Sequence, residues 1–227
     1  MIIIKFIIVG AVGYLLGSIP FGFLVSRRMA KVDVRQYGSG KLGTANVLRT
    51  AGSKAAVLVF FLDLLKGALA VLLAGLIFGG QYLVVGGFHW GVLVAQVIAA
   101  LAAMVGHCWS VFLKFRGGGR GVATFFGGLA ALCPPVALFG GEIFIIGAGL
   151  TKFVSLASIA AVVSTYAVFI PLTILNRFPL EYLIYALIGT IAIIIMHRDN
   201  IRRLLAGKER KMGEKTGLRS FNSLPRT

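Results

Sequence analysis

Long apolar runs alternate with short polar segments along the whole chain. Runs that approach the roughly 20 residues needed to cross a bilayer cover residues 2–25, 55–78, 90–105, 122–151, 155–175 and 180–196. The run at 122–151 contains the adjacent prolines Pro134 and Pro135, which one continuous helix cannot accommodate, so it predicts two short helices that meet near the far side of the membrane. The pattern predicts an all-α integral membrane protein with about seven transmembrane helices.

Composition agrees with a membrane protein. The 227 residues are 58% hydrophobic and 13% charged, with a mean hydropathy of +0.93, which is more apolar surface than a soluble core of this size can bury. The net charge of +16 would indicate nucleic-acid binding in a soluble protein. Here the cations lie between apolar runs and form no basic face interleaved with aromatic residues, so no nucleic-acid partner is predicted.

The basic residues predict the orientation in the membrane. Arg27, Arg28 and Lys31 directly follow the first apolar run, and the later polar segments on that side also carry Lys and Arg. The opposite side has only Lys5 and Arg177. By the positive-inside rule, the N-terminus lies outside and the C-terminus in the cytoplasm. The polar segments that this orientation brings to one membrane face are residues 26–54, 106–124 and 197–211.

The most unusual polar segment is residues 106–124, where the glycines at 117–119 lie between Arg116 and Arg120. Glycine tolerates positive φ, so successive backbone N–H groups in such a loop can turn toward one anion. An apolar run follows directly, as it does at phosphate sites on helix N-termini. Because the Walker spacing is absent, a flexible hairpin that carries positive-inside charge is an equally good interpretation.

The other two polar segments also contain groups that bind anions. Around Ser39 and Asn46, the first segment combines glycines, hydroxyls, an amide and cations, which fits an anion or polyol site or an ordinary loop before a helix. The last segment spaces His197, Asn200 and Arg203 at i, i+3 and i+6, so they share a face if the helix continues. A histidine at the membrane edge can act as acid or base, whereas contact with anionic lipid is the simpler account of the Arg and Lys residues.

Two charged residues interrupt the second apolar run. Asp63 and Lys66 lie on one helical face, and charges inside a membrane helix are paired or line a polar cavity. We interpret them as a structural ion pair near the cytoplasmic end, with a catalytic role for Asp63 as the alternative. The cysteines, Cys108 and Cys133, offer no disulfide framework or metal site, and Cys108 lacks the orienting groups of a nucleophilic triad.

Four groups of residues, in one order and on one predicted membrane face, carry a resemblance to a known family: 38–49, 63–67, 106–124 and 197–211. Together they resemble the bacterial acyl-phosphate:glycerol-3-phosphate acyltransferases of the PlsY type, over almost the whole chain. The resemblance implies an enzyme of phospholipid synthesis in the bacterial inner membrane, with its active site on the cytoplasmic face. It would transfer an acyl chain from acyl phosphate to the 1-position of glycerol 3-phosphate, giving lysophosphatidic acid and phosphate, with no metal or other cofactor.

The resemblance also assigns roles by position. Ser39, Arg49 and Arg120 would hold phosphate, and His197 and Asn200 would orient glycerol 3-phosphate; these are the predicted catalytic residues. The predicted substrate-binding set adds further residues of the chain: Gly40, Asn46, His107, Arg116, Gly117, Gly118, Gly119, Gly121, Thr124 and Ser155.

Two segments depart from the family pattern. Lys41 stands where the family normally has Asn, and the hydroxyl of Thr44 precedes Ala45 rather than following it. The loop at 115–121 has one additional glycine and carries arginine in place of both family lysines. Because of these departures, a family member that uses an acceptor other than glycerol 3-phosphate is an alternative interpretation.

Direct attack by the acceptor hydroxyl is the simplest mechanism, because acyl phosphate already has a good leaving group and no nucleophilic triad is visible. Either His197 or a phosphate oxygen of the acceptor would take the proton. The alternative from another class is a transporter or channel for a phosphorylated anion, against which the ionisable residues gather at one face rather than at the midplane. We expect residues 1–211 to form one transmembrane domain and residues 212–227 to form a basic tail, disordered or resting on anionic lipid.

Overall fold

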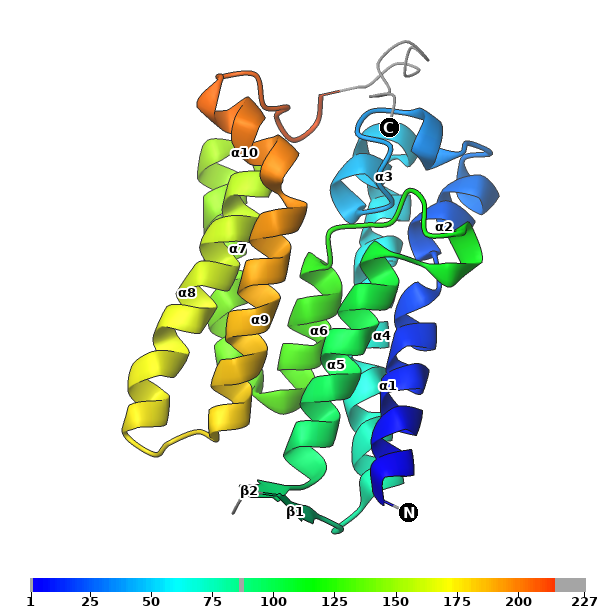
Figure 1. The fold of residues 1–227 in the computed structure, drawn as a ribbon. Helices are drawn as coiled ribbons and strands as arrows, with labels where there is room; N and C mark the ends of the chain where they lie inside the picture. Colours follow the sequence, from blue (N-terminus) through cyan, green and yellow to red (C-terminus); the bar gives the residue numbers. More distant parts are fainter. Residues whose placement is uncertain (1, 86–87, 215–227) are drawn as a thin grey trace.

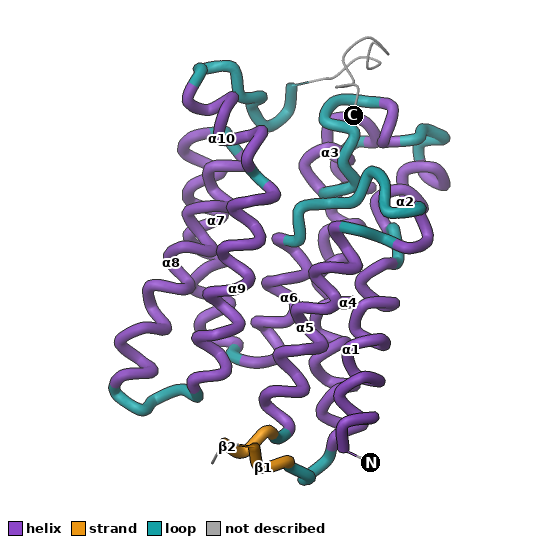
Figure 2. Tube along the Cα trace, in the orientation of Figure 1, coloured by secondary structure: helices purple, strands orange, loops and turns teal. Residues whose placement is uncertain are grey.

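The structure, a computed structural model, describes residues 2–85 and 88–214. Long helices run side by side between two ends of the molecule (Figures 1 and 2). They are α1 (Ile2–Ser18), α4 (Ser53–Phe78), α5 (Val92–Cys108), α6 (Val122–Leu132), α7 (Pro134–Thr151), α8 (Val154–Ile174) and α9 (Leu180–Met196). One end carries the short helices α2 (Phe21–Met29), η1 (Val34–Gln36), α3 (Thr44–Ala51), η2 (Val111–Leu113) and α10 (Arg198–Leu205).

The opposite end carries a small β-hairpin that the hydrophobic pattern did not predict. Its strands are β1 (Leu83–Val85) and β2 (Phe88–Trp90), which pair antiparallel. The hairpin connects α4 to α5 at the end where the N-terminus lies (Figure 1).

Each predicted apolar run contains a helix, so the prediction of an all-α membrane protein is confirmed. The run at 122–151 divides at Cys133, and the two prolines that follow occupy the first turn of α7, where a missing N–H costs nothing. The first run breaks between Ser18 and Phe21, around Pro20. A proline therefore lies at each break, and the sequence analysis predicted the one at Pro134 and Pro135.

The number of membrane spans is less sharply defined. Five described spans are long and apolar enough to cross a bilayer, and the bent pair α9 and α10 adds a sixth when the two helices count as one. At 11 residues, α6 is too short to cross alone at about 1.5 Å per residue. The count of about seven spans and the orientation of the termini stay predictions.

Small residues let the helices approach closely. A Cβ atom on Gly13 or Gly17 of α1 would overlap the α5 backbone at Ala99 or Ala103. The same kind of contact joins α4 to α6, where a Cβ on Gly67 would overlap the carbonyl of Thr124. Close packing of this kind is how membrane helices associate, since lipid supplies no hydrophobic driving force between them.

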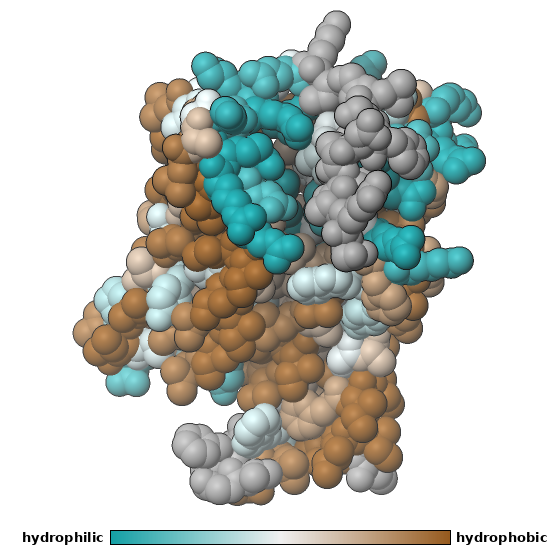
Figure 3. Space-filling model, turned by 45° about the horizontal axis from the view of Figure 1, so that its top comes forward, coloured by the Kyte–Doolittle hydropathy of each residue, from teal (hydrophilic) through white to brown (hydrophobic). Residues whose placement is uncertain are grey.

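Hydrophilic residues gather at one end of the molecule, over α2, α3, α10 and the neighbouring loops, while the surface along the helices is predominantly hydrophobic (Figure 3). All three polar segments of the sequence lie at that end (Figure 1), as predicted. Of the predicted tail, residues 212–214 are described, and Met212 N–H donates to the carbonyl of Lys152 at 2.7 Å. The rest of that prediction, residues 215–227, lies outside the described residues.

Candidate active site

A cavity of about 460 Å³ lies at the polar end, lined by residues of α3, α4 and α6 and by residues of α7, α8 and α10. Its volume is in the range of small-molecule sites. The predicted site residues that line it are Ser39, Asn46, Arg49, His107, Arg120, Gly121, Ser155, His197 and Asn200. The predicted residues that do not line it are Gly40, Arg116, Gly117, Gly118, Gly119 and Thr124.

One wall of the cavity is apolar. It is formed by Val57, Phe60 and Phe61 of α4 and by Phe144 and Ile145 of α7. Phe61 is 59% exposed and Ile145 is 70% exposed, so this wall is continuous with the hydrophobic surface of the bundle. The cavity is therefore amphiphilic, with ionisable groups at the polar end and an apolar side toward the membrane.

Asn46 fixes the loop that precedes α3. Its buried side-chain amide lies within hydrogen-bonding distance of the carbonyls of Val34, Tyr37 and Lys41, at 3.0, 3.1 and 3.0 Å. Its side-chain oxygen accepts the backbone N–H of Ser39 at 3.1 Å. Both polar atoms of the Asn46 side chain are thus hydrogen-bonded to the backbone. Asn46 contributes to the cavity by holding Ser39 and Lys41 at its wall.

Two glycines of the 117–119 loop, Gly118 and Gly119, pack against the end of α5. A Cβ atom on Gly118 would overlap the carbonyl of Cys108, and one on Gly119 would overlap the imidazole of His107. The N–H of Gly119 also donates to the carbonyl of His107 at 3.0 Å. The structure gives these glycines a packing role outside the cavity, which places Arg120 at its wall.

The arginines of that loop have different environments. Arg116 is exposed, whereas burial and the positive charges of Arg203 and Arg49 hold the pKa of Arg120 at about 10, below its ordinary value. The Nε atoms of Arg120 and Arg49 are buried with no hydrogen-bond partner among the described residues. Cations in this state favour an anionic ligand.

Glu209 links the last polar segment to α8. Its carboxylate accepts hydrogen bonds from Ser155 Oγ at 2.9 Å and from Asn200 Nδ2 and Arg203 Nε, both at 2.7 Å. Burial raises the pKa of Glu209, but these hydrogen bonds outweigh it and leave the pKa below its ordinary value. Glu209 is therefore an anion that fixes Asn200 and Arg203 at the cavity wall.

His197 lies directly after α9 and is 2% exposed. Its Nδ1 atom is 2.8 Å from the carbonyl oxygen of Ile193; because a carbonyl only accepts, Nδ1 carries the hydrogen and Nε2 is an acceptor in the neutral ring. Burial and the charge of Arg120 lower the pKa of His197 to about 4. At neutral pH the imidazole is therefore uncharged and can accept a hydrogen bond.

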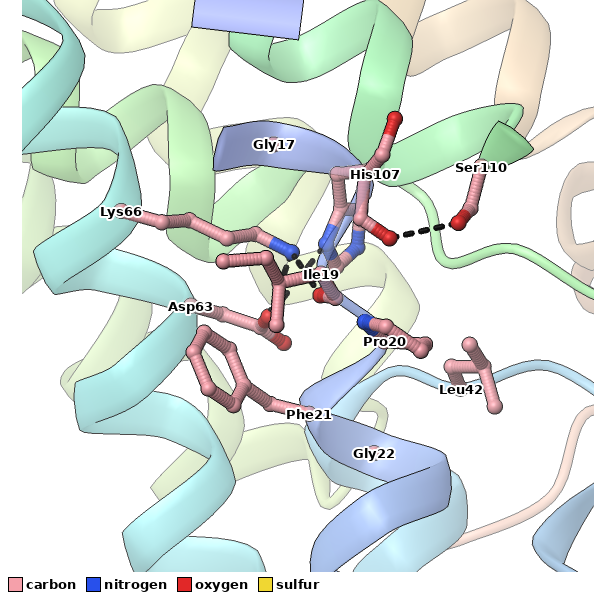
Figure 4. Close-up of a pocket in the computed structure, with 11 residues that line it drawn as sticks. Gly17, Ile19, Pro20, Phe21, Gly22, Leu42, Asp63, Lys66, His107 and Ser110 are labelled. Atoms are coloured by element: carbon pink, nitrogen blue, oxygen red, sulfur yellow. Dashed lines mark hydrogen bonds and ion pairs between the residues drawn. The ribbon is translucent and has the colours of Figure 1, made fainter. Parts of the chain in front are cut away.

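A buried ion-pair cluster lies where α1 breaks into α2 (Figure 4). Lys66 Nζ is 2.8 Å from Asp63 Oδ1 and donates to the carbonyl of Ile19 at 3.2 Å. His107 Nδ1 lies 3.5 Å from the same carboxylate oxygen. The predicted structural ion pair is thus confirmed, and it includes a histidine that the sequence analysis assigned to substrate binding.

Sequence reasoning did not assign several residues of the cavity. The apolar wall has no motif, and Arg210 and Met212 reach the cavity because the segment after α10 folds back toward α3, where Arg49 Nη2 donates to the carbonyl of Arg210 at 3.3 Å. Arg203 was recognised only by its helical spacing, and Glu209 only as part of a motif. The acidic residue among cations at 208–211 was the available signal for Glu209.

The fold and the cavity define an integral membrane protein with a cationic, amphiphilic site at the polar end of a helix bundle. The family model for glycerol-3-phosphate acyltransferase matches residues 7–207. The chain therefore belongs to the glycerol-3-phosphate acyltransferase family and is an enzyme of that family, so the resemblance found in the sequence is confirmed.

Individual relatives agree over nearly the full length. The chain is 61% identical to glycerol-3-phosphate acyltransferase 3 of Dehalococcoides mccartyi, over 95% of this chain and 100% of the relative. It is 46% identical to the glycerol-3-phosphate acyltransferase of Rubrobacter xylanophilus, over 90% of this chain and 94% of the relative. Crystal structures of PlsY, an integral membrane glycerol 3-phosphate acyltransferase, are also similar. Its glycerol 3-phosphate form gives a TM-score of 0.77 at 38% identity, covering 92% of this chain and 96% of that one.

Proposed function

We infer that the protein transfers a fatty acyl group from acyl phosphate to the 1-position of glycerol 3-phosphate, producing lysophosphatidic acid and inorganic phosphate. The observation that carries this proposal is the amphiphilic cavity. At its polar end, the buried Nε atoms of Arg49 and Arg120 have no hydrogen-bond partner among the described residues, and Phe60 and Phe61 line its apolar side. An activated donor with a phosphate head and an acyl tail fits that division.

The cations supply the binding energy that this reaction needs. Donor and acceptor both carry phosphate and repel each other, so Arg49 and Arg120 would hold them together and stabilise the negative charge that develops on the carbonyl oxygen. The acceptor oxygen forms the new ester bond with the carbonyl carbon as the bond from that carbon to the phosphate oxygen breaks. Phosphate leaves with the electron pair of that bond.

The hydroxyl proton would pass to a phosphate oxygen of the acceptor. His197 is a weak base in the substrate-free protein, because its pKa is lowered to about 4, while a phosphate monoester has a second pKa of about 6. With Nδ1 committed to Ile193, Nε2 of His197 would accept a hydrogen bond from the glycerol moiety, and Asn200 would hold it from the side. We assign His197 an orienting role.

The same arrangement supports a place in the cell. The excess of Lys and Arg at the polar end favours a cytoplasmic position for that end. The protein would be a multi-pass protein of the bacterial inner membrane, and water-soluble glycerol 3-phosphate would reach the site from the cytoplasm. The acyl tail would enter from the bilayer past the exposed side of Phe61. Membrane lipid and the two phosphorylated substrates are thus the proposed partners.

The proposal is tested with purified protein in non-ionic detergent, supplied with palmitoyl phosphate and glycerol 3-phosphate, with lysophosphatidic acid and phosphate measured together. Palmitoyl-CoA and palmitoyl acyl carrier protein are run beside it as donors. We expect equal amounts of both products with palmitoyl phosphate and none with the other donors. Product formed only from a thioester contradicts the proposed donor.

A transporter of phosphorylated anions stays the alternative from another class. Reconstituted vesicles separate the two functions, since flux of glycerol 3-phosphate without acyl transfer would favour transport. Arg49, Arg120 and His197 all line the cavity at the polar end of the bundle rather than a site at its midplane, which supports the enzyme.

A further inference from the structure

We propose that Lys41 is a phosphate-binding residue of the cavity, acting beside Arg120 on the phosphate group of one of the two substrates. The proposal deepens the proposed function and rests on it for the identity of those substrates. The group that Lys41 would bind is a phosphate dianion, which both the donor and the acceptor carry.

The backbone around Lys41 is held at the cavity. Its carbonyl lies 3.0 Å from Asn46 Nδ2, and its N–H donates to Ser39 Oγ at 3.4 Å. Asn46 is 2% exposed and sits in the first turns of α3, so the loop is fixed to a helix. Lys41 lines the cavity together with Ser39 and Arg120, which puts its flexible side chain on an anchored base.

The charge of Lys41 is not balanced by the described part of the chain. None of the ion pairs or hydrogen bonds there involves its ammonium group. Lys41 and Arg120 line the same cavity, and burial together with the positive charge of Arg120 lowers the pKa of Lys41. The exposed carboxylate of Asp199 raises the pKa of Lys41 but does not restore its ordinary value.

The two carboxylates that line the cavity are already committed. Asp63 is paired with Lys66 at 2.8 Å, and Glu209 with Arg203 at 2.7 Å. Two cations that face a cavity without a free carboxylate are costly to hold together, and an anion between them removes the repulsion. Arg120 also meets this requirement, because its buried Nε has no hydrogen-bond partner in the part of the chain that the structure describes.

The ligand that fits is a phosphate dianion rather than a monovalent carboxylate. Lysine binds phosphate as a compact point charge, while arginine adds directional donors. A single dianion would neutralise the charges of Lys41 and Arg120, leaving Arg49 for the second phosphorylated substrate. With one phosphate at Lys41 and Arg120 and the other at Arg49, the cavity would accommodate donor and acceptor at once.

The test compares Lys41→Met, which removes the charge at similar length, with Lys41→Arg, which keeps it. Lys54→Met is the matched control, because Lys54 is an exposed lysine at the start of α4 and does not line the cavity. Two measurements are made on each purified variant: calorimetric titration with inorganic phosphate, and KM for palmitoyl phosphate and glycerol 3-phosphate separately. Thermal melting confirms folding, and Lys41→Gln replaces the Met variant if that variant does not fold.

We expect Lys41→Met to weaken phosphate binding about tenfold or more, with a similar rise in one KM and little change in the other. The KM that rises identifies whether the donor or the acceptor phosphate meets Lys41. Lys54→Met should stay within about threefold of the parent protein, and Lys41→Arg should recover part of the phosphate affinity that Lys41→Met loses. Unchanged phosphate affinity in Lys41→Met overturns the proposal, whatever happens to the KM values.

Failure of the proposed function is a separate result. If the parent protein makes no lysophosphatidic acid from palmitoyl phosphate, the reaction is wrong, and the phosphate titration still tests Lys41 alone. If the parent protein is active and Lys41→Met matches Lys54→Met in both measurements, the reaction stands and Lys41 is not a phosphate ligand.

Discussion

His107 Nδ1 lies 3.5 Å from Asp63 Oδ1, while the opposite edge of the same imidazole contacts Gly119. Asp63 is in turn paired with Lys66, which donates to the carbonyl of Ile19 at the break between α1 and α2. One buried cluster therefore contacts the helix break (Figure 4) and, through His107, the loop that carries Arg120. We expect this cluster to hold Arg120 at the cavity wall.

The first prediction separates the charge of this cluster from its shape. Asp63→Asn leaves the Lys66 ammonium buried without a counter-ion, which should lower the free energy of unfolding by about 3 kcal/mol or more. Adding Lys66→Met removes the unpaired charge, so the double variant should be more stable than Asp63→Asn alone. Thermal melting in one detergent measures both. A double variant less stable than the single one would show that the charges are not coupled.

The second prediction concerns the two arginines of the glycine loop. Arg120→Ala should cost about 2 kcal/mol or more of transition-state stabilisation, seen as a fall in kcat/KM of roughly thirtyfold, and Arg120→Lys should recover part of it. Arg116→Ala is the matched control, since Arg116 is exposed and lies outside the cavity. Equal kcat/KM for Arg120→Ala and the parent protein would remove this loop from catalysis.

How far the sequence predicts this protein depends on the range of the interactions involved. The helices follow from local causes, because apolar length and the positions of Pro20, Pro134 and Pro135 determine where spans begin and break. The gathering of the polar segments follows from the distribution of Lys and Arg. Neither cause depends on a contact between distant residues, so both are visible in the chain.

The roles of individual polar residues depend on tertiary contacts and were less predictable. The side chain of Asn46 could bind an anion or a polyol, but its amide nitrogen is hydrogen-bonded to backbone carbonyls of the loop at 34–41. Gly118 and Gly119 look like a phosphate loop but pack on α5. Glu209 organises the site through Ser155, which is 54 residues away in the chain, and spacing alone does not show such a contact.

The third prediction tests Glu209 as the residue that positions Asn200 and Arg203. Glu209→Gln removes the charge that these donors share and replaces one acceptor oxygen by a donor. Hydrogen bonds to charged groups contribute about 1.5–3 kcal/mol each, so we expect a lower melting temperature and a rise in KM for glycerol 3-phosphate of about tenfold.

The control for that experiment is Glu181→Gln, in the first turn of α9 at the opposite end of the bundle. It should change neither quantity. A Glu209→Gln protein that melts earlier but keeps the KM of the parent protein would limit Glu209 to stability and exclude a positioning role for it.

The last prediction distinguishes orientation from general-base catalysis at His197. As an orienting residue, His197 contributes hydrogen bonds, so His197→Gln and His197→Asn should retain much of kcat and raise the KM for glycerol 3-phosphate. As the general base, its loss should lower kcat by roughly 100-fold or more. Steady-state kinetics of the two variants and the parent protein decide between these outcomes.

The pH dependence gives an independent measure of the same question. Because the pKa of His197 is lowered to about 4, the imidazole of the free protein stays neutral as the pH falls and gains a proton only on passing through that value. Glycerol 3-phosphate itself titrates near pH 6, so the quantity to follow is the ratio of kcat/KM in the parent protein to that in His197→Asn, from which substrate titration cancels. We expect this ratio to be flat between about pH 5.5 and 7.5. A ratio that falls below about pH 6.5, the ordinary value for histidine, together with a normal KM and nearly abolished kcat in His197→Gln, would make the histidine the base.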